Sequence, residues 1–124
     1  MSTYTVSIKE ASEQLTAKQR ISLKDTTSAL KLDEVTQAEN VQIFPVLYAV
    51  LNIHNDKSDN PDYENYIVVD KSGKKYVTGS ASFWDSFMNI ASEMEGENED
   101  WGIEVYRIPS KNYKGKEFIT CKII

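Results

Sequence analysis

The order of elements predicted along this sequence indicates a mainly β fold, a small and partly open five-stranded barrel with one helix between its third and fourth strands. Three features of the second half lead to this interpretation: a hairpin, an amphipathic helix and a closing pair of strands. A chain of 124 residues suits one core. We therefore expect a single domain over residues 1–124, with residues 1–19 as an N-terminal helical extension.

The hairpin is predicted from two short apolar runs that flank a polar turn. Ile67 to Asp70 and Lys75 to Thr78 have the composition of strands, and the segment between them contains Gly73. Glycine adopts positive φ without the steric cost of a side chain, which a tight turn requires. Of the hairpin residues, parity places Ile67, Val69 and Val77 inward and Tyr66, Val68, Tyr76 and Thr78 outward.

An amphipathic helix is predicted directly after the hairpin. Ser80 or Ser82 can cap its first turn, and Gly96 can end it in the left-handed conformation. The apolar residues recur at spacings of three and four, so we expect them to face the core. They are Phe83, Trp84, Phe87, Met88, Ile90, Ala91 and Met94.

Two alternating runs close the chain, Trp101 to Ile108 and Lys116 to Ile124, and a basic loop over 109–115 joins them. The first half is less regular. It predicts a helix over 11–19, a strand over 20–24 and a long, bent strand over 41–53. The missing N–H of Pro45 places this residue at an edge, a bulge or a strand start.

This order of strands and helix resembles the OB-fold, in which one sheet face and its loops bind oligonucleotides. An SH3-like barrel and an open α+β sheet are the alternative folds.

The charge and composition of the sequence disfavour several classes of function and of binding site. The net charge of −5 argues against binding to phosphates, yet residues 101–124 carry a local charge of +3. Cys121 is the single cysteine, so a disulfide within the chain and a cysteine-based zinc site are excluded. The N-terminus has no signal-peptide pattern, and no apolar run approaches the roughly 20 residues that span a bilayer. We expect a cytoplasmic protein without a cofactor or a membrane partner.

A binding site for a single nucleic-acid strand is predicted from aromatic residues that lie near lysines. Strand parity places two sets of residues on the faces opposite Val105 and Cys121: Glu104, Tyr106 and Ile108 in the first strand, and Phe118, Thr120 and Lys122 in the second. Bases stack on such rings for about 1–3 kcal/mol each, while lysine and arginine contact the phosphates. The candidate residues are Tyr66, Lys71, Lys74, Lys75, Tyr76, Tyr106, Arg107, Lys111, Tyr113, Lys114, Lys116 and Phe118.

The sequence gives little support for a catalytic motif or a metal-binding motif. His54 is the single histidine and lies in no recognisable nucleophile motif. Residues 56–67 alternate like a calcium loop, but Pro61 stands where glycine is needed and Ile67 where the bidentate glutamate is needed. We therefore expect neither an enzyme nor a metal site.

Two segments resemble the small single-stranded DNA-binding proteins encoded by bacteriophages of Gram-positive hosts. They are Tyr66 to Ser80, with its Asp-x-x-Gly turn, and Tyr106 to Thr120, with its Lys-Gly turn before the last strand. Together with the aromatic helix, the resemblance covers about half of the chain. Bacterial housekeeping proteins of this functional class carry a long acidic C-terminal tail, whereas this sequence ends in Lys122-Ile123-Ile124.

The resemblance implies a non-catalytic protein that coats single-stranded DNA, largely without sequence preference, during phage replication or recombination in the cytoplasm of the infected host. Phage or host replication and recombination proteins would be its further partners. The alternative is a protein–protein adaptor or homodimerisation module of the same fold that binds no nucleic acid.

Overall fold

The computed structural model describes residues 4–97, 99–111 and 115–124. The fold is mainly β, as the sequence predicts. Its elements are β1 (Tyr4–Ala11), α1 (Ala17–Lys24), a 3-10 turn η1 (Thr26–Ser28), β2 (Leu30–Lys31), α2 (Leu32–Val35), β3 (Val41–Ile43), β4 (Pro45–Asn55), β5 (Asp62–Asp70), β6 (Lys75–Thr78), α3 (Ala81–Met94), β7 (Ile103–Pro109) and β8 (Glu117–Ile123).

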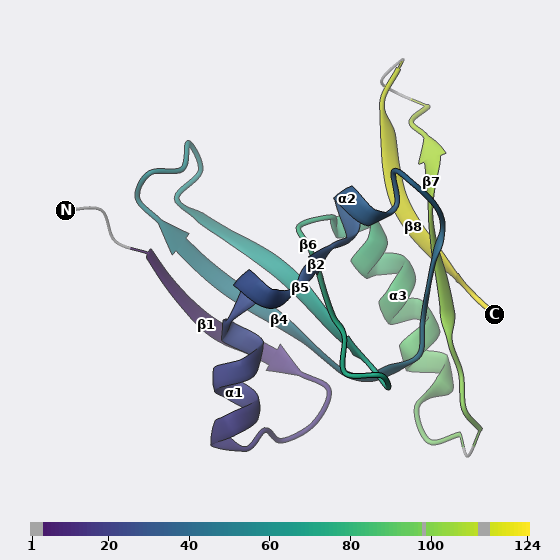
Figure 1. The fold of residues 1–124 in the computed structure, drawn as a ribbon, viewed down its shortest axis with the longest axis horizontal. Helices are drawn as coiled ribbons and strands as arrows, with labels where there is room; N and C mark the ends of the chain where they lie inside the picture. Colours follow the sequence, from purple (N-terminus) through teal and green to yellow (C-terminus); the bar gives the residue numbers. More distant parts are fainter. Residues whose placement is uncertain (1–3, 98, 112–114) are drawn as a thin grey trace.

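The strands form two sheets. One has the order β1-β4-β5-β6-β2 and the other β3-β7-β8, and every pairing is antiparallel except that of β2 with β6. Figure 1 shows the long β4–β5 hairpin and the β7–β8 hairpin as two diverging arms, with α3 beside the second. Within the described residues the two sheets do not close into a continuous barrel.

The predicted long bent strand is confirmed, with its bend at Phe44. This residue separates β3 from β4, so one stretch of chain contributes to both sheets. The Phe44 N–H donates to Asp70 Oδ1 (2.7 Å), and the Phe44 carbonyl accepts from the Lys71 N–H (2.9 Å). Pro45 needs no partner for its nitrogen. The bend is therefore held by the end of β5 and the first residue of the β5–β6 turn.

The predicted hairpin and helix are also confirmed. Gly73 lies in the β5–β6 turn with φ +92°, and Gly96 follows α3 with φ +84°. Ser80 is the N-cap of α3, and its hydroxyl accepts from the Phe83 N–H at 3.2 Å. On the other side, the Ser82 hydroxyl donates to the Ile119 carbonyl (3.0 Å). The helix thus lies against β8, the end strand of the smaller sheet.

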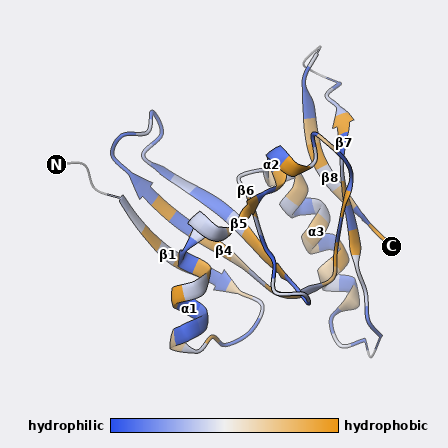
Figure 2. Cartoon of the chain, in the orientation of Figure 1, coloured by the Kyte–Doolittle hydropathy of each residue, from blue (hydrophilic) through white to orange (hydrophobic). Residues whose placement is uncertain are grey.

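Two hydrophobic clusters bury both faces of the central β4–β5 pair. The larger contains Val68 of β5 with Phe83 and Phe87 of α3, and it extends to β7 and β8. The smaller lies under α1, where Leu23 packs against Leu51 and its neighbours. Figure 2 shows hydrophobic residues along both sheets and a hydrophilic β4–β5 connection. Because both faces are covered, residues of β5 that parity places outward are still enclosed.

The predicted N-terminal helical extension over 1–19 is wrong for residues 4–16 and agrees with the structure only at residues 17–19, which belong to α1. Residues 4–11 form β1, whose half-buried Val6 and Ile8 alternate with exposed residues and pack against the smaller cluster. The helix begins later: the Thr16 hydroxyl accepts from the Gln19 N–H, and the Gln19 side chain accepts from the Thr16 N–H.

The strand predicted over 20–24 is likewise wrong, since these residues lie in α1. Leu23 is 1% exposed because the helix turns it onto β4, and that long-range contact prevails over local alternation. Among the described residues, no helix has the length and apolar character needed to cross a bilayer.

Candidate nucleic-acid interface

The outer face of the β7–β8 hairpin carries two of the predicted aromatic residues. In the strand register Tyr106 faces Thr120 and Ile108 faces Phe118, so the two rings lie on the same face as diagonal neighbours. Phe118 is 36% exposed and Tyr106 is half-buried. We call Tyr106, Ile108, Phe118 and Lys122 the hairpin face.

Lys122 is the cation of the hairpin face, and Glu104 lies opposite it in the strand register. Its Nζ lies 5.3 Å from the centroid of the Tyr106 ring and 3.4 Å from Glu104 Oε2. The ammonium group is exposed, so its ion pair with Glu104 is weak and open to competition from a phosphate. Lys111 and Lys116 are exposed at the loop end of the hairpin, where the Ser110 N–H donates to the Lys116 carbonyl (2.8 Å). The predicted site residues Tyr113 and Lys114 lie outside the described residues.

Arg107 lies on the other face of β7 and links this strand to α2. Its Nε donates to the Thr36 hydroxyl (3.1 Å), and its NH2 group donates to the Asp33 carbonyl. Both partners belong to α2 and its C-cap. A phosphate could engage this guanidinium only by displacing these bonds, so we assign Arg107 a structural role.

The predicted outward position of Tyr76 is wrong. Parity correctly groups Tyr66, Val68 and Tyr76, but that face lies over the larger cluster. Tyr76 is 6% exposed, and Val68 is 1% exposed. Tyr66 is half-buried and stacks on Trp84 of α3, with centroids 4.8 Å apart and an interplanar angle of 10°. These rings pack within the protein, because α3 covers the face that an isolated hairpin would leave open.

The lysines of the β5–β6 turn lie away from the hairpin face. Lys71 Nζ is 4.4 Å from the Phe44 ring centroid, and Lys74 is exposed. Lys75 Nζ donates to the carbonyls of Ser22 (2.8 Å) and Asp25 (2.9 Å), so it caps the C-terminus of α1. Figure 1 shows the β5–β6 turn at the bottom of the view, whereas the end of β7 and the start of β8 lie toward the top. The predicted lysines of the β5–β6 turn are therefore separate from the predicted residues of the β7–β8 hairpin.

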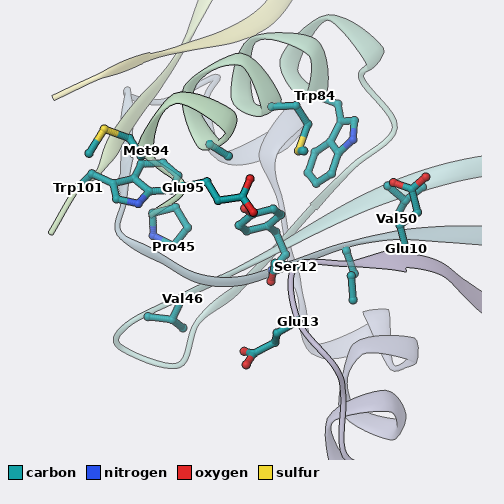
Figure 3. Close-up of a pocket in the computed structure, with 15 residues that line it drawn as sticks. Glu10, Ser12, Glu13, Pro45, Val46, Val50, Trp84, Met94, Glu95 and Trp101 are labelled. Atoms are coloured by element: carbon teal, nitrogen blue, oxygen red, sulfur yellow. The ribbon is translucent and has the colours of Figure 1, made fainter. Parts of the chain in front are cut away.

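The structure also forms a cavity of about 530 Å³ between α3 and the β1–β4 side of the larger sheet. Tyr48, Trp84 and Trp101 provide its rings, and Met88 and Met94 lie among them. We call the cavity lined by these five residues the aromatic groove (Figure 3). The sequence predicts Trp84 and Met88 as core with Phe83 and Phe87, but only the two phenylalanines are fully buried.

The spacing of apolar residues along α3 is a feature of the sequence that could have predicted the aromatic groove. Trp84, Met88 and Ala91 form a stripe one residue after the buried stripe of Phe83 and Phe87. A helix with an apolar face this wide has more surface than one layer of strands covers.

The rim of the aromatic groove is acidic. Glu10, Glu13 and Glu95 line it, and none of the described residues that line it is lysine or arginine. Figure 3 shows Glu95 reaching into the space between Trp84 and Trp101. Burial raises the pKa of the Tyr48 hydroxyl, and the nearby Glu95 carboxylate raises that pKa further. The negative charge of the three glutamates disfavours binding of a phosphate in the groove and favours binding of a cation.

His54 lies on the β4–β5 arm between two carboxylates. Its Nδ1 is 2.7 Å from Asp62 Oδ1, and its Nε2 is 2.5 Å from Asp56 Oδ1. The hydrogen bonds to Asp62 and Asp56 raise the pKa of His54. Within residues 4–97, 99–111 and 115–124, no group of three or more His, Cys, Asp or Glu side chains is placed to hold a metal ion.

Comparison with family models, with curated proteins and with solved structures gives no match to this chain. Its function is therefore inferred from its own residues and their geometry.

Proposed function

We propose that this protein is a non-catalytic single-stranded DNA-binding protein that contacts the strand through the hairpin face. The observation that carries the proposal is the placement of Tyr106 and Phe118 on one exposed face, with Lys122 beside the Tyr106 ring. Rings accept stacked bases of any sequence, and lysines neutralise phosphates without reading bases. The protein would coat single strands during phage DNA replication or recombination, where phage or host proteins of those processes would be its further partners.

The strand connections support an OB-fold. The bent segment β3–β4 pairs with β7 on one side of the bend and with β5 on the other, and α3 lies between β6 and β7 in the chain. If the bent segment β3–β4 is counted as the first strand of such a barrel, with β5 and β6 as the next two, α3 would follow the third strand, and β1 and β2 would be additions to it. β6 pairs with β2, and among the described residues it has no pairing with β8, which accounts for the opening. The β7–β8 connection is one of the loops that border the binding face in such folds.

The charge distribution allows binding despite a net charge of −5. Lys122 lies on the hairpin face, and Lys111 and Lys116 are exposed near the loop end of the same hairpin. For single strands, log K falls with log salt at about −0.7 per phosphate contact, so three contacts give a slope of about −2. Stacking of two bases would contribute a further amount of about 2–6 kcal/mol that depends little on salt.

The acidic aromatic groove favours a second candidate function, an adaptor module that binds a protein and no nucleic acid. The salt dependence of ligand binding distinguishes the two functions. Phosphate binding weakens as salt rises, whereas an apolar protein interface changes little.

The test is a fluorescence anisotropy titration with labelled oligo-dT, compared with duplex DNA and repeated at low and high salt. We expect binding to the single strand with the salt slope given above. Tyr106→Ala and Phe118→Ala should each weaken it by about 5- to 150-fold, which corresponds to about 1–3 kcal/mol per stacked base. Tyr4→Ala, an exposed aromatic on β1, is the matched control and should change nothing. Absence of binding at low salt would refute the proposal and leave the adaptor function.

A further inference from the structure

The aromatic groove is built from two elements that the fold holds at a fixed separation. α3 contributes Trp84, Met88 and Met94, and β4 contributes Tyr48 on the opposite wall. Trp101 lies in the segment between α3 and β7, beside Pro45 (Figure 3). A volume of about 530 Å³ is within the range of pockets that enclose a ligand of several side chains.

The rings of the aromatic groove pack against other aromatic rings of the fold. Trp84 stacks on Tyr66 (4.8 Å between centroids) and on Phe87 (5.2 Å). Tyr48 contacts Phe87 edge-on at 4.9 Å, and Trp101 is 6.1 Å from the same ring. Phe87 itself is fully buried. The groove is therefore a rigid aromatic surface that loses little conformational entropy when a ligand binds.

The acidic rim restricts the chemistry of that ligand. Glu10 and Glu13 come from the end of β1 and the residues after it, and Glu95 is the C-cap of α3. Among the described residues, none of the three carboxylates forms a salt bridge. Three uncompensated negative charges around an apolar interior disfavour a polyanion, so the groove is chemically distinct from the hairpin face.

Aromatic rings and carboxylates together form a site for a cation on an apolar segment. An arginine or lysine bound over Trp84 or Tyr48 gains a cation–π interaction, and Glu95 offers an ion pair from the rim. The methionines adapt to apolar neighbours of varied shape. A small polar metabolite would leave the apolar interior unfilled, whereas a peptide with basic and large apolar side chains uses both parts of the lining.

We propose that the aromatic groove binds a segment of a partner protein in which an arginine or lysine stands next to large apolar residues. The two surfaces thus serve different ligands, DNA at the hairpin face and a basic, apolar peptide at the groove. The groove proposal does not depend on DNA binding.

The test begins with selection from a displayed library of random peptides against the full chain. The selected peptides should be enriched in arginine or lysine flanked by aromatic or aliphatic residues. Their affinities are then measured as free peptides by calorimetry. Failure to select any peptide, or selection of acidic or purely polar ones, would overturn the proposal.

Charge reversal places the bound peptides in the groove. Glu95→Lys should weaken the selected peptides at least tenfold, about the loss of one favourable charge pair. Glu93→Lys is the matched control, since Glu93 is exposed on the same helix but does not line the groove, and it should stay within about twofold of wild type.

Oligo-dT binding by Glu95→Lys distinguishes the peptide site from a DNA site. We expect it to be unchanged, because the hairpin face is intact. If Glu95→Lys and Glu93→Lys bind the selected peptides with equal affinity, the groove is not the peptide site. Competition between oligo-dT and the peptide would likewise refute the proposal. Sedimentation of the free chain tests the remaining occupant, because a dimer that Glu95→Lys dissociates would show that a second copy fills the groove.

Discussion

Asp70 connects the β5–β6 turn to the bend between β3 and β4, and its removal should destabilise the protein strongly. Its carboxylate accepts from the Phe44 N–H (2.7 Å) and from the Ser72 N–H (2.8 Å), and the residue is 8% exposed. Asp70→Ala would leave the Phe44 N–H without this acceptor at the point where one chain segment passes from one sheet to the other.

The expected cost follows from the two hydrogen bonds. A bond to a charged group contributes about 1.5–3 kcal/mol, and we take the lower value because the turn is open to water, which gives about 3 kcal/mol. For a chain of 124 residues each kcal/mol lowers Tm by about 4 °C, so Asp70→Ala should lower Tm by about 12 °C. Asp70→Asn keeps one acceptor oxygen but directs an NH₂ group at the second donor, so its loss should be intermediate.

Thermal denaturation followed by circular dichroism measures these changes. Asp59→Ala, in the exposed β4–β5 connection, is the control and should shift Tm by less than about 2 °C. A Tm for Asp70→Ala that matches this control would refute the view that the carboxylate holds the bend.

The pH dependence of Asp70 provides a second readout. Burial raises its pKa, but the hydrogen bonds from Ser72 and Phe44 lower it by more, so the pKa lies below its ordinary value. A carboxyl with a lowered folded-state pKa stabilises the protein above its unfolded pKa of about 3.9, and this contribution is lost as pH falls through the folded value. The Tm difference between wild type and Asp70→Asn should therefore shrink on acidification below about pH 4.

Three further predictions concern other parts of the fold. The pKa of His54 is raised by Asp62 and Asp56, so its stabilising effect is complete below about pH 6.5 and is lost as pH rises through the folded value; the Tm advantage of wild type over His54→Gln should decline over that range. Burial raises the pKa of Cys121 to about 12, so a thiol reagent should modify the chain only at the rate of unfolding. A Cβ at Gly102 would lie 2.6 Å from the Phe44 ring, so Gly102→Ala should cost about 1–3 kcal/mol in urea denaturation, and Phe44→Ala should remove much of that cost.

The second half of the chain was predictable because its local signals agree with its tertiary contacts. Ser80 and Gly96 mark the ends of α3, and Gly73 has the positive φ that its turn requires. Ile103 and Val105 of β7 are fully buried, as their alternation predicts. β5 pairs with β6 and β7 pairs with β8, so much of this half packs with neighbours in the sequence and its local patterns are informative.

The N-terminal third was not predictable, because its structure depends on distant partners. β1 is an end strand that pairs with β4, from Ala11 with Ala49 to Tyr4 with Asn55, and only its inner residues pack against the smaller cluster. Arg20 to Lys24 alternate like a strand, but they form a helix since Leu23 fills the space above β4. The β2–β6 pairing involves only two residues of each strand, too few for a sequence pattern.

Strand parity grouped side chains correctly but could not tell what covers each group. For β7 and β8 the predicted outer residues Tyr106 and Phe118 stay accessible, but Thr120 on the same face is 9% exposed and its hydroxyl hydrogen-bonds the Ser86 hydroxyl of α3 (2.8 Å). For β5 the same reasoning failed at Tyr76, because α3 lies over the face that parity labels outward. A prediction of exposure needs the position of the next layer, which parity does not contain.

The position of α3 also explains how a chain with a net charge of −5 can present a basic surface. The helix and the segment after it carry Glu95 and Trp101 to the groove, while β7 runs from there to Lys111 at the far end of the hairpin. Ten residues of mostly extended chain separate Trp101 from Lys111, roughly 30 Å. Because charges are screened over about 8 Å at physiological ionic strength, the glutamates of the groove have little effect on a phosphate at the hairpin loop. Net charge is thus a poor guide to the ligands of this fold, and the local charge of each surface decides what it binds.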